Sequence, residues 1–122
     1  MAKILLVEDD RIVSRLIENH LQRKGHIVRT LADGRSASAF VNSDLEIPDL
    51  VLLDLMLPFV DGFEILTQIR QNPRWEKVSV ILLTSKGQEK NIVRAFELGA
   101  NDYILKPFNR EEVAVRIKRQ IT

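Results

Sequence analysis

Short apolar runs alternate with segments of helical periodicity along the whole chain, which leaves few folds open to it. The runs are Lys3–Val7, Ile27–Leu31, Leu50–Leu53, Val78–Leu83 and Tyr103–Leu105. The first, third and fourth consist almost entirely of Ile, Leu and Val, which is typical of strands buried on both faces of a sheet. Because strands that alternate with helices pair in parallel through crossovers, we predict a doubly wound α/β fold with helices on both faces.

Five segments between and after these runs repeat apolar residues at helical spacing. The stripes are Ile12–Leu16–Ile17–His20–Leu21, Ala37–Phe40–Val41, Phe63–Leu66–Ile69, Ile92–Ala95–Phe96 and Val113–Ile117–Ile121. Gly25 and Gly99 follow the first and fourth stripes, where helices commonly end. Asn109 is an expected N-cap of the last helix, with Glu112 three residues later. Asn42–Asp49 reads as a surface loop. With 122 residues and no repeat or linker-like stretch, the sequence predicts one domain over residues 1–122.

The charge balance and the absence of cysteine exclude several kinds of site. The chain has 18 basic and 17 acidic residues and a net charge of +1, which gives no support to broad electrostatic binding of nucleic acid or membranes. Without cysteine, it can form neither disulfides nor thiolate metal sites. The first apolar run is too short for a signal peptide or a membrane span, so we expect a soluble, cytoplasmic protein.

Polar side chains follow four of the five predicted strands: Glu8–Asp10, Asp54, Thr84 and Lys106. If the first, third, fourth and fifth strands are neighbours, these side chains converge beyond the carboxyl edge of the sheet, where open α/β sheets bind ligands. Clustered carboxylates repel one another unless a cation or a proton relieves them, and all-oxygen ligands with water access suit Mg²⁺. A carboxylate there can attack phosphorus to give an acyl phosphate, with the ammonium and the hydroxyl suited to stabilise the transferring phosphoryl group.

Five motifs carry a resemblance to a known family. They are Val-Glu-Asp-Asp at the first strand, Leu-Leu-Asp-Leu-Met-Leu-Pro with the later Asp-Gly, Leu-Thr-Ser, Gly-Ala-Asn-Asp-Tyr and Lys-Pro-Phe. In this order and spacing, the chain resembles the receiver domain of bacterial response regulators over essentially its whole length. The resemblance implies a flavodoxin-like sheet of five parallel strands in the order 2-1-3-4-5.

The resemblance also implies roles for the acidic residues. Asp54 matches the aspartate that receives a phosphoryl group from a histidine kinase or a phosphotransfer protein. Glu8 and Asp9 match the acidic pair that holds Mg²⁺, with Asp9 as the direct ligand and Glu8 acting through water. Asp54 itself completes the metal site together with the backbone carbonyl of Met56. The domain would assist its own phosphorylation and dephosphorylation rather than act as an enzyme on other molecules.

A second group of residues matches the family's switch. Thr84 and Lys106 resemble the pair that senses the phosphoryl group, and the bond between Lys106 and Pro107 matches one that is typically cis. Tyr103 resembles the aromatic residue that turns inward after Thr84 moves. The implied output surface consists of the fourth helix, the fifth strand and the fifth helix.

Charges of both signs occur on that output surface, and they allow two interpretations. The residues are Arg94, Glu97, Asp102, Arg116 and Lys118. One hypothesis is a two-fold homodimer in which Asp102 pairs with a basic residue of the partner's last helix; the other is a solvated helix face. Because no effector domain is present in this sequence, we expect no direct binding of nucleic acid by it.

Three other classes of protein share part of this pattern. A flavodoxin-like cofactor binder needs a Gly/Ser/Thr-rich loop after the first strand, whereas this loop is acidic. A haloacid-dehalogenase-like phosphatase has a second Asp two residues after the nucleophile, where this chain has Met56. The serious alternative is a pseudo-receiver that acts as a phosphorylation-independent interaction module. Such modules usually lack the Asp or the Lys, and this chain has both Asp54 and Lys106.

Several residues near these motifs have simpler readings. We expect Asp10 to cap the first helix rather than to join the site. Asp61 and Gly62 read as a turn in which Gly adopts a permissive backbone conformation. Trp75 is interpreted as a surface loop anchor.

Other positions bear on metal binding and on the lifetime of a phosphoryl group. His20 and His26 read as helix and strand residues without metal spacing. Phe59 with Val60 and Lys86 are less typical of the family, which leaves the lifetime of a phosphoryl group open.

Overall fold

The computed structural model describes residues 1–43, 45–85 and 89–121. Its strands are β1 (Lys3–Val7), β2 (Ile27–Leu31), β3 (Leu50–Asp54), β4 (Ser79–Ser85) and β5 (Asp102–Lys106). They form one parallel sheet in the order β2-β1-β3-β4-β5. The predicted doubly wound fold and strand order are therefore confirmed, with strand bounds that differ from the prediction by one or two residues.

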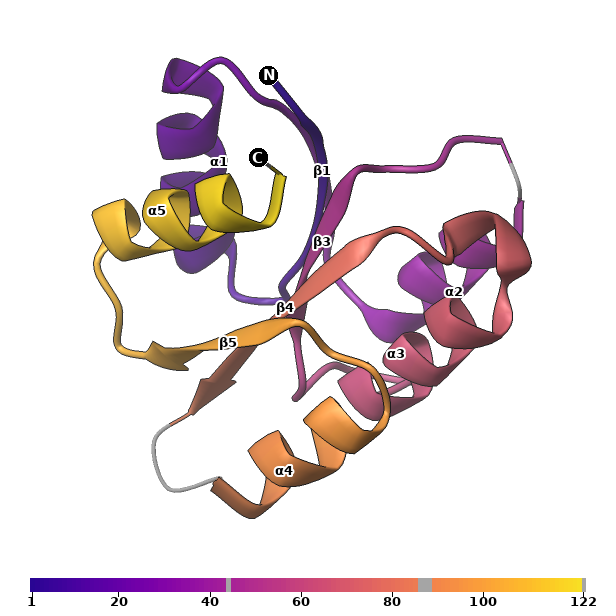
Figure 1. The fold of residues 1–122 in the computed structure, drawn as a ribbon. Coiled ribbons are helices and arrows are strands. Elements are labelled where there is room, and N and C mark those ends of the chain that lie inside the picture. Colours follow the sequence, from indigo (N-terminus) through magenta and orange to yellow (C-terminus); the bar gives the residue numbers. More distant parts are fainter. Residues whose placement is uncertain (44, 86–88, 122) are drawn as a thin grey trace.

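The helices are α1 (Arg11–Arg23), α2 (Gly34–Ser43), α3 (Gly62–Gln71), α4 (Glu89–Glu97) and α5 (Arg110–Ile121), with a short 3-10 turn η1 (Pro73–Trp75) before β4. Helices α1 and α5 cover one face of the sheet, and α2, α3 and α4 lie on the other side (Figure 1). Asn42 and Ser43, predicted to open a surface loop, instead belong to α2, which extends to Ser43.

The sheet separates two apolar cores, as expected for strands that alternate side chains between two faces. Leu6, Leu52 and Leu83 pack toward α1 and α5, in a cluster that includes Ile17 and Ile117. The other cluster, toward α2, α3 and α4, includes Leu5, Val51, Leu82, Leu66 and Ala95. All five residues of β3 are buried, and β3 and β4 consequently form the rigid centre from which the ends of the strands project.

Two predicted helix caps are present. The Asp10 side chain accepts hydrogen bonds from the amides of Ile12 and Val13 at 2.9 and 3.2 Å, so its reading as the N-cap of α1 is confirmed. The Glu112 amide donates to Asn109 Oδ1 at 2.7 Å at the start of α5. Both caps satisfy amides that have no partner within the helix.

Trp75 is not the surface anchor that its position after Pro73 suggested. Its side chain is fully buried in the cluster beneath α2 and α3, and its ring meets that of Phe40 edge to face at a centroid distance of 6.1 Å. Within the described part of the chain, its indole Nε1 has no hydrogen-bond partner. The turn η1 therefore folds inward and adds a large aromatic side chain to the core.

Gly62 serves a different purpose from the one its Asp-Gly sequence suggested. Asp61 is the N-cap of α3 and Gly62 its first residue, and Gly62 does not have a positive φ. A Cβ atom on Gly62 would lie 2.5 Å from the backbone oxygen of Asp54 and 2.6 Å from Leu55 Cα. Glycine is required because α3 starts directly against the end of β3.

We expect the Gly62→Ala variant to be destabilised by about 1–3 kcal/mol, because the added methyl group forces the backbone of α3 away from β3. Elsewhere in a helix the same change normally stabilises a protein. Urea unfolding followed by circular dichroism measures the effect. Gln71→Ala, at an exposed position of the same helix, is the control, and it should change stability by less than about 0.5 kcal/mol. Equal stability of both variants would contradict the close approach.

His20 is a helix residue as predicted, but His26 lies just outside the strand to which it was assigned. His20 lies in α1 with Nε2 3.2 Å from Glu111 Oε1, whereas His26 precedes β2 and accepts the Ala2 amide through Nδ1. Lys86 lies outside the described residues. No helix within residues 1–43, 45–85 and 89–121 has the length and apolar character needed to cross a bilayer.

Candidate functional site

Three carboxylates meet at the carboxyl edge of the sheet. Glu8 and Asp9 follow β1, and Asp54 is the last residue of the neighbouring strand β3. Each offers an oxygen atom, and these atoms all lie within 4.8 Å of one another. Glu8 and Asp54 are buried, whereas Asp9 is exposed and gives the cluster access to water.

Lys106 reaches this cluster from the end of β5. Its Nζ lies 2.6 Å from Glu8 Oε1 and 3.0 Å from Asp54 Oδ2. Burial lowers the pKa of Lys106, but hydrogen bonding and charge attraction from Glu8 and Asp54 outweigh it and leave the pKa raised. The ammonium therefore stays protonated at neutral pH and partly neutralises the carboxylates. The bond between Lys106 and Pro107 is cis, as the motif suggested.

The carboxyl group of Glu8 has a strongly raised pKa. Burial and the neighbouring Asp54 carboxyl raise its pKa to about 7, although Lys106 and the Asp10 amide act in the opposite direction. One ammonium is thus insufficient to hold all three carboxylates in their charged form near neutral pH. A divalent cation would supply the missing positive charge, and Glu8, Asp9 and Asp54 offer the hard oxygen ligands that Mg²⁺ prefers.

The Asp54 carboxylate is held at both oxygens. Oδ2 accepts from Lys106, and Oδ1 accepts from the backbone amide of Met56 at 3.0 Å. The Met56 side chain is 61% exposed and points away from the core, so the residue acts on Asp54 through its backbone. A carboxylate at a strand end with a fixed orientation and an open approach is suited to act as a nucleophile. The amide contact from Met56 was not anticipated, because the sequence carries no signal for it.

Thr84 and Tyr103 occupy neighbouring strands on the side of the sheet that faces α4. Thr84 is buried, and within the described residues its Oγ1 has no hydrogen-bond partner. It follows Leu83, which pairs with Asp54 in the sheet, so the hydroxyl lies beside the end of β3. Tyr103 is partly buried, and its ring packs edge to face on Phe96 of α4 at 5.9 Å. A buried hydroxyl without a partner is costly, and an incoming oxyanion would give it one.

Asp102 is paired within its own chain. Its two carboxylate oxygens accept from Nη1 of Arg116 at 3.0 and 3.1 Å, and Nε of Arg116 also bonds to Glu112. The hypothesised pairing of Asp102 with a partner's last helix would have to replace this contact. The dimer stays a prediction.

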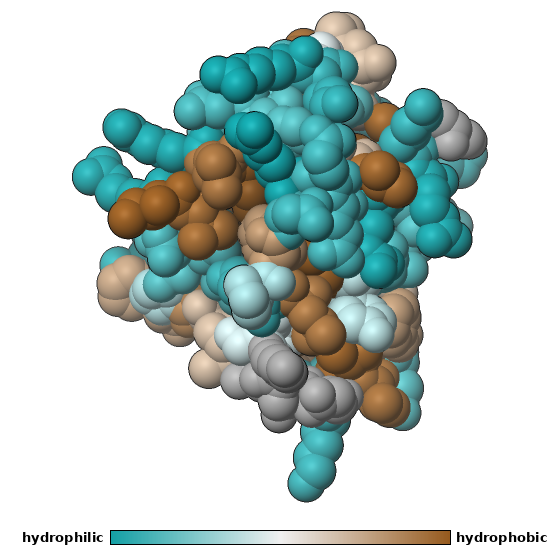
Figure 2. Space-filling model, turned by 90° about the vertical axis from the view of Figure 1, so that its left-hand side faces the viewer, coloured by the Kyte–Doolittle hydropathy of each residue, from teal (hydrophilic) through white to brown (hydrophobic). Residues whose placement is uncertain are grey.

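Apolar side chains are exposed next to the acidic cluster. Ile12 and Leu16 of α1 are 83% and 49% exposed. A shallow cavity there is lined by Val13, Leu16, Lys106, Pro107 and Phe108. On the side of the molecule that carries α1 and α5, such apolar groups lie between hydrophilic ones (Figure 2). The face beside Lys106 is therefore bordered by exposed apolar side chains.

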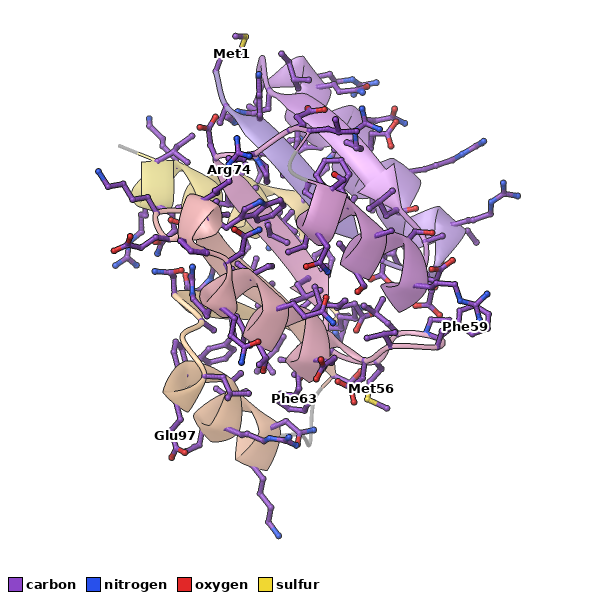
Figure 3. The ribbon with its side chains drawn as sticks, turned by 90° about the vertical axis from the view of Figure 1, so that its right-hand side faces the viewer. Met1, Met56, Phe59, Phe63, Arg74 and Glu97 are labelled. Atoms are coloured by element: carbon purple, nitrogen blue, oxygen red, sulfur yellow. The ribbon has the colours of Figure 1, made fainter. Side chains whose placement is uncertain are left out.

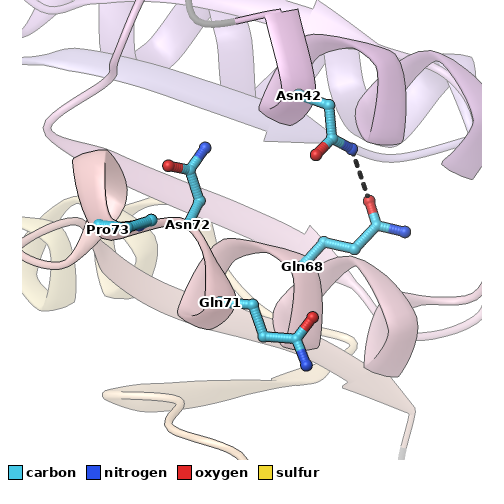
Figure 4. Close-up of a pocket in the computed structure, with 5 residues that line it drawn as sticks. All are labelled: Asn42, Gln68, Gln71, Asn72 and Pro73. Carbon is cyan, nitrogen blue, oxygen red and sulfur yellow. Dashed lines mark hydrogen bonds between the residues drawn. The ribbon is translucent and has the colours of Figure 1, made fainter.

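A second hollow lies between α2 and α3, away from the acidic cluster. It is lined by Asn42, Gln68, Gln71, Asn72 and Pro73 (Figure 4). Two of its side-chain amides form hydrogen bonds. Asn42 Nδ2 donates to Gln68 Oε1 at 3.2 Å, and Asn72 Nδ2 donates to the Val41 carbonyl at 3.0 Å. These bonds join α2 to α3, so these amides have a structural role in holding the two helices together.

Comparison with known proteins identifies the sequence pattern. A family model described as the response regulator receiver domain matches residues 4–118. Over 117 residues the chain is 42% identical to the transcriptional regulatory protein ResD of Bacillus subtilis (strain 168). This alignment covers 95% of this chain and 46% of ResD. It is 40% identical over 119 residues to the regulatory protein VanRc of Enterococcus gallinarum, covering 98% of this chain and 49% of VanRc. The chain spans about half the length of these curated relatives.

Solved structures match along the whole chain. A putative response regulator from Chloroflexus aurantiacus J-10-fl superposes with a TM-score of 0.89 at 33% identity, covering 98% of this chain and 97% of that one. The chemotaxis response regulator CheY4 of Vibrio cholerae gives a TM-score of 0.89 at 28% identity, covering 98% of both chains.

Proposed function

Because the chain belongs to the family of response regulator receiver domains, we propose that it accepts a phosphoryl group on Asp54 from a histidine kinase or a phosphotransfer protein. The observation that supports this most directly is the position of the Asp54 carboxylate. It lies among Glu8, Asp9 and Lys106, with one oxygen 3.0 Å from an ammonium and the other 3.0 Å from a backbone amide. In two-component signalling of this kind, the domain would act in the cytoplasm.

The reaction proposed is attack by an Asp54 oxygen on the phosphorus of a phosphohistidine. The phosphorus–nitrogen bond breaks, the imidazole leaves with its electron pair, and a new phosphorus–oxygen bond gives an acyl phosphate. Lys106, whose Nζ lies 3.0 Å from Asp54 Oδ2, would neutralise charge on the transferred group. The Thr84 hydroxyl, which has no partner among the described residues, would donate to it. Hydrolysis by water would return Asp54 and release inorganic phosphate.

Glu8, Asp9 and Asp54 would hold a Mg²⁺ ion, with the Met56 carbonyl as a further ligand. When bound, the ion supplies positive charge that stabilises the phosphoryl oxygens. The raised pKa of Glu8 supports this assignment, since the cluster is short of positive charge. The chain's own part is to fix Asp54 and to keep the other two carboxylates in reach.

We expect Mg²⁺ to raise the melting temperature of the protein at pH 8. At a free Mg²⁺ concentration of 100 times its Kd, the gain in unfolding free energy should be about 2.7 kcal/mol. The rise should be smaller at pH 6, because Glu8, with a pKa of about 7, then carries a proton that the ion must displace. Differential scanning fluorimetry with and without EDTA measures both. Asp9→Asn should lose most of the rise, whereas Asp61→Asn, which retains a helix cap, should keep it. A rise that survives in Asp9→Asn would assign the ion to other ligands.

Coupled movements of the Thr84 and Tyr103 side chains are proposed to carry the signal to the surface formed by α4, β5 and α5. Both residues lie on the side of the sheet covered by α4, and the Tyr103 ring already contacts Phe96 of that helix. A move of Thr84 toward a phosphoryl group would free space for Tyr103. ResD is named a transcriptional regulatory protein and VanRc a regulatory protein, and both are about twice as long, so this domain would control a partner or a further domain.

Intact-mass spectrometry after incubation with acetyl phosphate and Mg²⁺ tests the proposal. We expect one added phosphoryl group per chain, and none when EDTA replaces Mg²⁺. Circular dichroism in parallel shows that the sample is folded. A folded protein that gains no mass would instead indicate a pseudo-receiver that acts through binding alone.

A further inference from the structure

The loop between β3 and α3 has a backbone conformation that its sequence does not favour. Phe59 has a φ of 72°, and bulky side chains rarely adopt this left-handed region. Its ring does not gain burial in return, because the residue is 71% exposed. Phe59 projects at the edge of the molecule, in the same loop as Met56 (Figure 3). Some other contact must hold the loop in this conformation.

That contact is made by the first turn of α2. The Arg35 guanidinium lies over the Phe59 ring, with Cζ 4.1 Å from the ring centroid, which is a close cation–π geometry. The Gly34 amide donates to the carbonyl of Pro58 at 3.1 Å. A Cβ atom on Gly34 would lie 1.7 Å from the Val60 carbonyl oxygen, so the two backbones touch directly. The Arg35 side chain thus adds a contact to a loop whose backbone already packs against α2.

The same loop begins at the group that orients the phosphoacceptor. Met56 is three residues before Phe59, and its amide donates to Asp54 Oδ1 at 3.0 Å. The Gly62 amide donates to the Leu55 carbonyl at 3.0 Å and fixes the other end of the loop. Between these two points, Leu57 and Val60 pack against the core, and the contacts to α2 restrain the exposed tip of the loop at Pro58 and Phe59.

We propose that Arg35 and Phe59 form a clamp that fixes the β3–α3 loop on α2 and thereby positions the Met56 amide on Asp54. They are positioning residues, since neither touches the reacting atoms. The inference rests on the proposed function of Asp54. It implies that opening the clamp slows phosphoryl transfer without loosening the fold.

The Phe59→Gly variant separates positioning from stability. Glycine adopts a positive φ without steric cost, so this variant should unfold at the same or a higher urea concentration than the wild type. Loss of the ring should nevertheless slow labelling by acetyl phosphate by about two- to fivefold. Arg35→Ala should slow labelling to a similar extent, and Phe59→Tyr, which keeps an aromatic face, should restore the wild-type rate. Arg23→Ala, at an exposed position in the last turn of α1, is the control and should label normally.

The double variant Arg35→Ala, Phe59→Gly tests whether the two residues act as one unit. Labelling no slower than in either single variant supports the clamp, whereas multiplied effects overturn it. Labelling at the wild-type rate in both single variants also overturns it.

Amide hydrogen exchange at Met56, followed by NMR without any phosphodonor, gives a separate readout. We expect Met56 to exchange about two- to fivefold faster in each single variant, and an unchanged rate overturns the clamp. If the wild-type protein shows no labelling while the variants still accelerate exchange at Met56, the clamp stands and the proposed function of Asp54 fails.

Discussion

Replacement of Asp54 by asparagine should abolish the phosphoryl adduct. The amide of Asp54→Asn keeps the shape of the side chain and can still accept the Met56 amide hydrogen bond, but it is a very weak nucleophile toward phosphorus. We expect labelling by acetyl phosphate and Mg²⁺ to fall by roughly 100-fold or more, as is usual when a nucleophile is removed. Intact-mass spectrometry followed by peptide mapping measures the loss.

A carboxylate beside the cluster provides the matched control for Asp54→Asn. Asp10 lies next to Asp9 but caps α1, and asparagine caps a helix about as well as aspartate. Asp10→Asn should therefore fold and be labelled at close to the wild-type rate. Labelling that persists in Asp54→Asn, or that is lost in Asp10→Asn instead, would move the acceptor to another residue.

The Trp75→Ala variant should lose about 3–5 kcal/mol of unfolding free energy. The wild-type indole is fully buried and lies against Phe40, so its removal leaves a cavity between η1 and α2. Since small domains have only about 5–15 kcal/mol of stability, this variant could be partly unfolded at 37 °C. Urea unfolding should be followed by circular dichroism, because Trp75 is also the chain's single fluorescent indole.

Two further variants keep the Trp75 prediction measurable. Trp75→Phe retains most of the apolar volume and removes a buried Nε1 that has no partner among the described residues, so its loss should be much smaller than that of Trp75→Ala. Leu45→Ala, at a position that is 89% exposed, should change stability by less than about 0.5 kcal/mol. A loss below about 1 kcal/mol in Trp75→Ala would show that η1 is not part of the core.

The strands were predictable because their signal is local. Leu50–Leu53 and Val78–Leu83 are nearly continuous apolar runs of strand length, which is the pattern of strands buried on both faces. Helix ends were predictable for the same reason, since the Asp10 and Asn109 caps bond to amides only two or three residues away. Errors of one or two residues, as at Ser43, are common because the last turn of a helix often frays and its end is poorly defined.

The meeting of polar residues at one edge of the sheet was predictable, but the geometry of the cluster was not. Glu8, Asp54 and Lys106 each follow a strand, and the parallel order of the sheet brings the strand ends together. No sequence pattern states that Lys106 lies 2.6 Å from Glu8, or that burial raises the pKa of Glu8 to about 7. These values depend on how deeply the neighbouring strands bury each group.

Sequence patterns were enough to predict the order of elements, the burial of the sheet on both faces and the polar residues at its carboxyl edge. Each of these follows from the spacing of residues along one segment, or from the rule that parallel strands end at the same edge. The burial of Trp75, the close approach of Gly62 to Asp54 and the position of Arg35 over Phe59 depend instead on how the elements pack. Each of those contacts joins residues on different elements, and the local sequence does not specify which element packs beside them.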